Sequence, residues 1–400
     1  MRGGRLEIAE EGRVHRFGQA DAALQARVEV FDPRAWSGLL RGSTGWGEGY
    51  VDGYWATDDL VDLTRIACRN LAPFDRWRRR LHPILGPLQR VAKLVPQNTR
   101  AGARSNISAH YDLGNELFAA FLDEGMTYSC AYFPDPDASL GRAQVAKIER
   151  LCRALRLGPD DHLLEIGTGW GSFAIHAATE HGCRVTTTTI SREQHAYATE
   201  RVRGAGLADR VTLLLRDYRD LDGRYDKLVS VEMIEAVGWQ YLETFFRTCA
   251  RLLEPDGLMA LQAIVIGDDQ YEAEKASRSF SNKHVFPGGC LPSARLIAEL
   301  TGAKTDLRTI WLDDISAHYA RTLELWRRRF NAAWSQLRAL GYDERFRRLW
   351  NFYLASSEAG FRERRIRDLQ VLFAKPAWRS ATAAMDARSV SEGESAPIPA

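Results

Sequence analysis

Long hydrophobic runs are missing from this 400-residue chain. No stretch of about eighteen apolar residues occurs, and residues 1–17 lack the apolar core and the cleavage site of a signal peptide. This excludes a membrane channel and predicts a chain that stays in the cytoplasm. A large net charge is missing too, since 54 Lys and Arg offset 52 Asp and Glu. The balance excludes a globally basic nucleic-acid-binding protein, so any basic surface must be local.

Cysteine pairs are also missing. The six cysteines are scattered without a CxxC pair, which argues against a disulfide framework and against a structural zinc site, and we expect no metal. Most of them are expected to be reduced thiols in the core. What the chain does contain, at 45% hydrophobic residues, is enough apolar material for two or three globular domains.

Changes in composition divide the chain into four parts. A small helical N-terminal domain is expected over residues 1–90, with a loop in the Gly- and aromatic-rich segment GSTGWGEGYVDGYW. A basic linker is expected over 91–105, at the end of a stretch (74–104) that holds eight Lys or Arg and one Asp. The main domain follows over 106–378. Residues 379–400 are small, polar and aperiodic, which predicts a disordered tail.

Strand patterns alternate with helical patterns beyond about residue 160. This alternation predicts a parallel sheet with helices on both faces. The expected strands are 162–167, 183–190, 210–217, 225–233 and 257–266. From 314 to 368 the pattern becomes helical.

A glycine-rich turn follows the first expected strand, in the segment LEIGTGWG. Glycines let the backbone pass close to a ligand, and the helix that follows offers unpaired N–H groups. The spacing is G-x-G-x-G rather than the G-x-G-x-x-G of dinucleotide-binding proteins, and Glu165 precedes the first glycine by two residues. We therefore favour S-adenosylmethionine over NAD, with Gly167, Gly169 and Gly171 at the cofactor.

The ends of the next two strands point to the same cofactor. The second strand lacks the acidic residue that a dinucleotide enzyme places at a ribose, and Thr188, Thr189 and Gln194 offer neutral hydrogen bonds instead. Plain strand propensity is the alternative for the threonine run. At the end of the third strand, Asp217 and Tyr218 are placed to bracket an adenine, and the alternative is a turn residue beside a core aromatic ring.

Eight sequence blocks carry a family pattern: HYDLGN (110–115), FLD (121–123), MTYSCAYF (126–133), LEIGTGWG (164–171), MIEAVG (233–238), FPGGCLPS (286–293), YLA (353–355) and EAGFR (358–362). They resemble the cyclopropane-fatty-acid synthase family of S-adenosylmethionine-dependent methyltransferases. The resemblance runs from about residue 104 to 375, and the segment near 46–55 is similar to the N-terminal domain of bacterial members. It implies an α/β fold, a Rossmann-like class I methyltransferase sheet with inserted and C-terminal helices.

The implied reaction is methyl transfer from S-adenosylmethionine to the cis double bond of an unsaturated acyl chain in a membrane phospholipid, which forms a cyclopropane fatty acid. The first alternative is a 10-methylene or 10-methyl branched chain of the tuberculostearic type, completed by a separate reductase. More distant alternatives are a methyltransferase of small soluble molecules and a non-catalytic lipid-binding module. The implied partners are the phospholipid and the inner, anionic membrane surface, with a homodimer as the assembly and no nucleic acid.

The resemblance also implies a bound bicarbonate as the base. Its holders would be Cys130, Glu235, Tyr319, the backbone of Ile264, and Gln262 at a position where many members carry histidine. Glutamine donates through its amide but does not titrate near neutrality, so this departure leaves the product open between ring and branch.

Four further positions complete the expected site. Glu232 adds a second carboxylate near Glu235 and is expected to alter where the proton leaves. Tyr128 and Ser129 are expected at the cofactor, and His110 is a site-lining candidate.

Lys and Arg outnumber acids twelve to six across residues 321–368, with Trp and Phe between them. Such clusters suit anionic lipid headgroups. A solvated helix face is the alternative.

Overall fold

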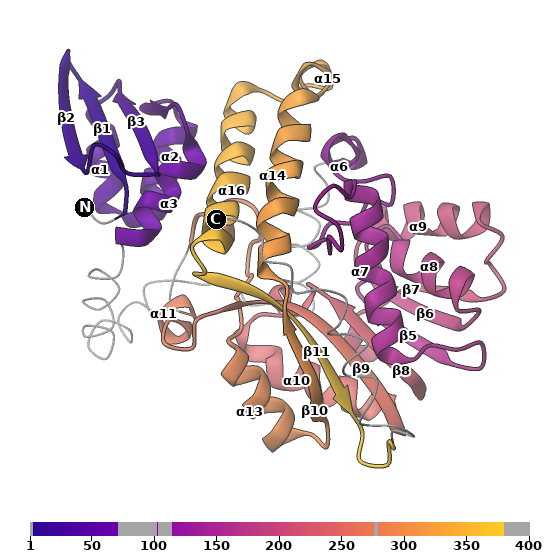
Figure 1. The fold of residues 1–400 in the computed structure, drawn as a ribbon. Helices are drawn as coiled ribbons and strands as arrows, with labels where there is room; N and C mark the ends of the chain where they lie inside the picture. The colour runs from indigo at the N-terminus through magenta and orange to yellow at the C-terminus, as the bar shows by residue number, and fades with distance from the viewer. Residues whose placement is uncertain (1–2, 71–101, 103–113, 276–278, 380–400) are drawn as a thin grey trace.

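The computed structural model of the protein describes residues 3–70, 102, 114–275 and 279–379 (Figure 1). Within these ranges a small N-terminal unit lies beside a larger α/β unit. The expected linker 91–105 falls outside the described residues except for residue 102, and the expected tail does so beyond residue 379.

A seven-stranded sheet lies at the centre of the larger unit, in the order β10-β11-β9-β8-β5-β6-β7. Five of its strands run parallel, and all five expected strands are present with slightly shifted ends. They are β5 (His162–Ile166), β6 (Arg184–Thr189), β7 (Val211–Leu215), β8 (Tyr225–Val231) and β9 (Leu253–Ile266).

Two strands that the sequence analysis missed extend this sheet. β11 (Ile366–Ala374) pairs antiparallel with β9, and β10 (Arg308–Asp314) pairs antiparallel with β11, so the sheet is mixed rather than purely parallel. β11 is buried over most of its length. In the sequence it is therefore a short apolar run directly after a helical pattern. Periodicity alone does not distinguish such a run from a continuation of the helix.

Helices cover both faces of the sheet, as expected for this fold class. The core of one face includes α7 (Leu140–Leu155), α8 (Ser172–Glu180) and α9 (Arg192–Gly204). The core of the other includes α10 (Leu242–Leu252) and α13 (Ala294–Lys304). The Rossmann-like α/β arrangement is thereby confirmed.

A group of helices stands at one end of the sheet, where α14 and α16 lie side by side (Figure 1). Its aromatic side chains, with Phe118, Trp326 and Trp350 at the centre, form one continuous core with the buried side chains of the N-terminal unit. None of the helices in the described ranges combines the length and the apolar character needed to cross a bilayer. The group comprises α6 (Asn115–Phe121), α11 (Tyr271–Lys275), α12 (Phe280–His284), α14 (Ser316–Ala332), α15 (Trp334–Ala339) and α16 (Glu344–Arg362).

The N-terminal unit contains the expected helices and also a four-stranded sheet that we did not expect, in the order β2-β1-β3-β4. Glu11 and Gly12, both with positive φ, form the two-residue turn between β1 and β2, which is the geometry that tight hairpins prefer. The elements are β1 (Arg5–Glu10), β2 (Arg13–Gly18), β3 (Gln25–Val30), α1 (Arg34–Leu40), α2 (Gly42–Val51), β4 (Trp55–Thr57) and α3 (Leu60–Asn70).

The glycine-rich segment expected as a loop is mostly the helix α2. Its glycines are explained by close packing rather than by turns. A Cβ atom at Gly47 would lie 2.6 Å from ring atoms of both Phe280 and Phe352, and one at Gly38 in α1 would lie 2.6 Å from the Gly45 carbonyl oxygen. The glycines therefore let α2 approach α1, α12 and α16.

Arginine side chains attach the N-terminal unit to α16. Arg348 donates to the backbone carbonyls of Tyr50 and Trp55 at 2.5 and 2.7 Å. Arg345 pairs with Asp52 at 3.0 Å. These contacts fix the small unit next to the end of the sheet where the candidate site lies.

Candidate active site

The glycine-rich turn joins β5 to α8 at the carboxyl edge of the sheet. Gly167, Gly169 and Gly171 have φ of 108°, 52° and 91°, a region that favours glycine. The Gly167 N–H donates to the Thr188 carbonyl at 3.0 Å, which holds the turn against β6. The turn thus presents the N-terminus of α8 to the space beyond the strands.

A cavity of about 1380 Å³ occupies that space and reaches the N-terminal unit. Of the residues expected at the cofactor, all but Gly171 line it: Tyr128, Ser129, Glu165, Gly167, Gly169, Thr188, Thr189, Gln194, Asp217 and Tyr218. Gly171 instead caps α8 beside the cavity wall.

Glu165 is a buried carboxyl group on this wall. Its Oε2 accepts a hydrogen bond from the Thr187 hydroxyl at 2.6 Å, and the Thr187 and Thr168 hydroxyls lie 2.7 Å apart. Burial raises the pKa of Glu165 to about 8. Strand propensity alone gave Thr187 no role, whereas the structure shows it supporting Glu165.

The other polar residues expected at the cofactor are engaged with protein groups. Thr188 donates to the Arg216 carbonyl at 2.5 Å, and Thr189 donates to Gln194 Oε1 at 3.0 Å. Asp217 accepts from the Arg219 guanidinium at 2.9 and 2.7 Å. These contacts set the shape of the wall.

Deeper in the site, the Glu232 carboxylate accepts three hydrogen bonds from groups that the sequence analysis had placed together. The donors are the Cys130 N–H at 2.8 Å, the Gln262 amide at 2.7 Å and the Tyr319 hydroxyl at 2.6 Å. Glu232 itself has φ of 47°, an unusual backbone conformation for this residue type. Such conformations are costly and cluster at functional sites, which makes Glu232 a candidate functional residue.

Glu235 lies three residues after Glu232 in the chain, in a short 3-10 helix. Its Oε1 accepts from the Ile264 N–H, while its buried Oε2 has no hydrogen-bond partner among the described residues. Burial, reinforced by the negative charge of Glu232, raises the pKa of Glu235 to about 8. The site therefore holds Glu235 protonated at neutral pH more readily than an ordinary glutamate.

Two buried charged residues at this site were missed from the sequence. Asp368 on β11 accepts from the Gln262 amide at 3.1 Å, and burial beside Glu232 and Glu235 raises its pKa well above the usual range. Lys147 on α7 donates to the Ser129 hydroxyl at 2.7 Å, and burial lowers its pKa. The available signal was a charge inside an otherwise apolar pattern, as in the strand sequence IRDLQVLFA.

Cys130 is fully buried and does not line the cavity. Its thiol donates to the Ala131 carbonyl at 3.2 Å, and burial raises its pKa well above the usual range. The thiol is therefore neutral, and this residue serves the site through its backbone N–H.

Aromatic rings surround the same part of the cavity. Tyr319 stacks on Phe361 with ring centroids 4.4 Å apart, and the Tyr128 and Tyr353 hydroxyls lie 2.9 Å apart. Phe286 closes the group at 5.7 Å from the Tyr353 ring. All five residues line the cavity. Ring faces of this kind stabilise a developing positive charge.

Comparisons with known proteins show which family the chain belongs to. Residues 98–371 match the family described as mycolic acid cyclopropane synthetase. The chain belongs to this family. It is 43% identical over 332 residues to tuberculostearic acid methyltransferase UfaA1 of Mycobacterium tuberculosis, covering 80% of this chain and 76% of that protein.

Two other relatives support the assignment. The chain is 37% identical over 364 residues to the cyclopropane-fatty-acyl-phospholipid synthase of Escherichia coli strain K12, covering 90% and 89% of the two chains. The crystal structure of mycolic acid cyclopropane synthase CmaA1 complexed with SAH and CTAB superposes with a TM-score of 0.64 at 31% identity, covering 68% of this chain and 98% of that one.

As a member of the mycolic acid cyclopropane synthetase family, the protein is an S-adenosylmethionine-dependent methyltransferase, and the resemblance read from its sequence is confirmed. Not every expected residue is described. His110 and most of the basic stretch 74–104 lie outside the described residues.

The residues assigned to bicarbonate do not fit that ion in this family member. The Ile264 N–H is taken by Glu235, while the Tyr319 hydroxyl and the Gln262 amide are taken by Glu232. Bicarbonate could reach these donors only by displacing the carboxyl groups of Glu232 and Glu235 from them. The protein's own carboxylate occupies the position that the sequence analysis gave to the ion.

Proposed function

We propose that the protein transfers a methyl group from S-adenosylmethionine to the cis double bond of an unsaturated acyl chain in a membrane phospholipid, and that the product is a cyclopropane fatty acid. One observation carries the proposal: a single cavity connects the glycine-rich turn, the aromatic rings and Glu232 with apolar side chains of the N-terminal unit. A cavity of this composition suits an acyl chain better than a small polar acceptor.

The residues around the cavity meet the demands of this reaction. S-adenosylmethionine supplies a methyl group whose bond to sulfur breaks with the electron pair left on sulfur, while the alkene electron pair forms the new bond to carbon. The faces of Tyr319, Phe361 and Tyr128 stabilise the carbocation that results. The Glu232 carboxylate then accepts one proton from the cation.

Glu232 is suited to this role by its surroundings. Its three donors stabilise the charged form, whereas burial raises its pKa above that of an ordinary glutamate, so the group is a stronger base than an exposed carboxylate. Proton loss from the transferred methyl group closes the ring.

A second candidate product is a methylene-branched chain, later reduced by a separate enzyme. Proton loss from a neighbouring chain carbon gives this product. Glu232 can serve as the base for this product too, if the acyl chain presents a neighbouring carbon to it rather than the transferred methyl group. The similarity to a tuberculostearic acid methyltransferase is in line with this alternative.

We propose that the acyl chain enters the cavity beside the N-terminal unit. Leu39 and Leu40 line the cavity and are 50% and 90% exposed, which indicates its opening. The arginines of α14 and α16 are less suited to headgroups than expected, since many pair with acids: Arg327 with Glu358 at 3.1 Å and Arg362 with Glu324 at 2.9 Å are examples. We therefore place membrane contact at α1.

The test is to express the chain in a bacterial host that lacks such enzymes and to analyse its fatty acid methyl esters by gas chromatography and mass spectrometry. We expect a ring-containing ester heavier by one CH2 than the unsaturated ester. A methylene-branched ester would favour the second product. Absence of both, together with methylation of a soluble acceptor without vesicles, would overturn the proposal.

Glu232→Gln tests the assigned base. It is expected to lower product formation by about 100-fold or more, because a positioned base contributes roughly that much. Calorimetric binding of S-adenosylmethionine should stay unchanged. The matched control Glu200→Gln, at an exposed position on α9, should keep full activity. Activity of Glu232→Gln that rises with added bicarbonate would assign the base to the ion instead.

A further inference from the structure

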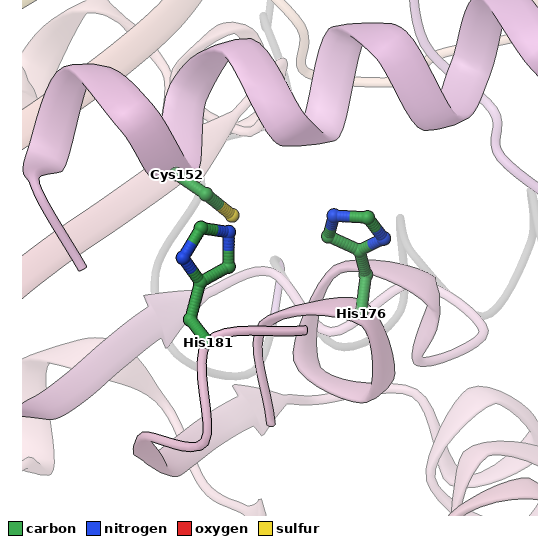
Figure 2. A group of neighbouring side chains, drawn as sticks. All are labelled: Cys152, His176 and His181. Atoms are coloured by element: carbon green, nitrogen blue, oxygen red, sulfur yellow. The ribbon is translucent and has the colours of Figure 1, made fainter. Parts of the chain in front are cut away.

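A mixed cluster of metal-binding side chains lies between α7 and the end of α8. One ligand atom each from Cys152, His176 and His181 lies within 4.8 Å of the others. Figure 2 shows the three side chains pointing into the space between the two helices. None of them lines the cavity described above, so the methyl-transfer site does not account for them.

Glu149 is a fourth candidate ligand, beside the two histidines of this cluster. It lies three residues before Cys152 on α7, a spacing that places both side chains on one face of the helix. Its Oε2 lies 3.0 Å from the Nε2 atoms of both His176 and His181. One carboxylate oxygen therefore faces two ring nitrogens at once.

Both ring nitrogens of His181 face an oxygen atom. Its Nδ1 lies 3.3 Å from the Leu157 carbonyl oxygen, and its Nε2 lies 3.0 Å from Glu149 Oε2. Each of these contacts needs a proton or a metal ion between the nitrogen and the oxygen. A metal ion bound by Nε2, with the ring proton on Nδ1, satisfies both contacts.

We propose that Cys152, His176, His181 and Glu149 bind one Zn²⁺ ion. Thiolate, imidazole and carboxylate are the ligands that zinc takes, at bond lengths of about 2.0 to 2.3 Å. A tetrahedron of these bonds sets ligand atoms roughly 3.3 to 3.7 Å apart, so binding would draw the three clustered ligand atoms closer than their present 4.8 Å and would bring Glu149 toward Cys152. The His181 contact to Leu157 is the kind of outer hydrogen bond that orients a metal-bound histidine.

The proposed ion has a structural role, because four protein ligands leave no open position for a substrate. It ties α7 to the C-terminal end of α8, whose other end begins at the glycine-rich turn. The sequence expectation of no zinc site rested on missing cysteine pairs. The fold instead assembles one cysteine with histidines and a glutamate from residues 149–181.

The test is a Co²⁺ titration of the full-length, tag-free protein after chelator treatment. We expect one Co²⁺ per chain, with a thiolate-to-cobalt charge-transfer band in the near ultraviolet and the intense visible bands of tetrahedral cobalt. Binding releases the thiol proton. Zn²⁺ should displace the cobalt and remove both sets of bands. This readout needs no methyl transfer, so it is independent of the proposed function.

Variants identify the ligands. Cys152→Ser should lose the charge-transfer band, whereas Cys249→Ser, at a buried thiol on the opposite face of the sheet, should retain it. His176→Gln provides a second test if Cys152→Ser does not fold, and should weaken Co²⁺ binding by about tenfold or more. No stoichiometric uptake by the stripped wild-type protein, or a band that survives Cys152→Ser, would overturn the proposal.

Discussion

Glu232, Glu235 and Asp368 place three buried carboxyl groups in one site, so their charges compete. Like charges at short range favour ionisation of only some members of such a group. Glu232 accepts from three donors, whereas Glu235 Oε2 and Asp368 Oδ1 have no hydrogen-bond partner among the described residues. The three donors therefore favour the negative charge on Glu232, whereas burial beside it raises the pKa values of Glu235 and Asp368 and favours their protonated forms.

This assignment predicts a pH-dependent effect of Glu235→Gln. In the folded protein the pKa of Glu235 is about 8, against about 4.5 for an ordinary glutamate. As pH rises from about 5 to 8, the unfolded chain loses this proton before the folded one, so the wild-type protein loses stability. Glutamine has no proton to lose. The unfolding free energy of Glu235→Gln relative to wild type should therefore rise by roughly 4 kcal/mol across this window.

Urea denaturation at pH 5, 7 and 8.5 measures the difference. The exposed Glu200→Gln serves as the control and should show the same pH dependence as wild type. A constant difference between Glu235→Gln and wild type at all three pH values would contradict the raised pKa.

Helices and strands with a regular pattern of apolar residues could be predicted from the sequence. Those whose residues are determined by packing against distant parts of the chain could not. The five parallel strands follow from apolar runs that end in turn residues. α2 did not follow, because its glycines are set by the rings of Phe280 and Phe352, more than 200 residues away in the chain. Similarly, the family pattern brought Cys130, Gln262 and Tyr319 together, but only the fold shows Asp368 and Lys147 beside them.

The packing of α2 predicts opposite effects for two glycine-to-alanine changes in helices. Gly47→Ala places a Cβ atom 2.6 Å from two rings and should lower the unfolding free energy by about 1 to 3 kcal/mol. Gly302→Ala in α13 meets nothing within 4 Å and should raise it by roughly 0.5 to 1 kcal/mol, through better helix propensity. Urea denaturation tests both. Equal effects of the two changes would contradict close packing at α2.

At the scale of the whole molecule, the net charge is only +2 because acids offset the many arginines. Some of these arginines form ion pairs between the N-terminal unit and the larger unit. Arg65 and Arg69 of α3 both pair with Glu363, just after α16, at 2.9 and 2.7 Å. Partly exposed pairs of this kind add little stability each, so their effect is mainly on orientation. They keep the N-terminal unit over the cavity, where Leu39 and Leu40 form its proposed opening to the membrane.

This arrangement predicts that charges at the opening weaken membrane binding without affecting binding of the cofactor. Leu39→Asp with Leu40→Asp should weaken binding to phospholipid vesicles by about 100-fold or more, since each inserted leucine contributes roughly 1.5 to 3 kcal/mol. Product formation on vesicles should fall with it, while calorimetric binding of S-adenosylmethionine stays at the wild-type value. Leu340→Asp is the matched control, because Leu340 is 58% exposed but does not line the cavity. Vesicle sedimentation that shows equal losses for the double variant and for Leu340→Asp, or none for either, would place the membrane contact elsewhere on the molecule.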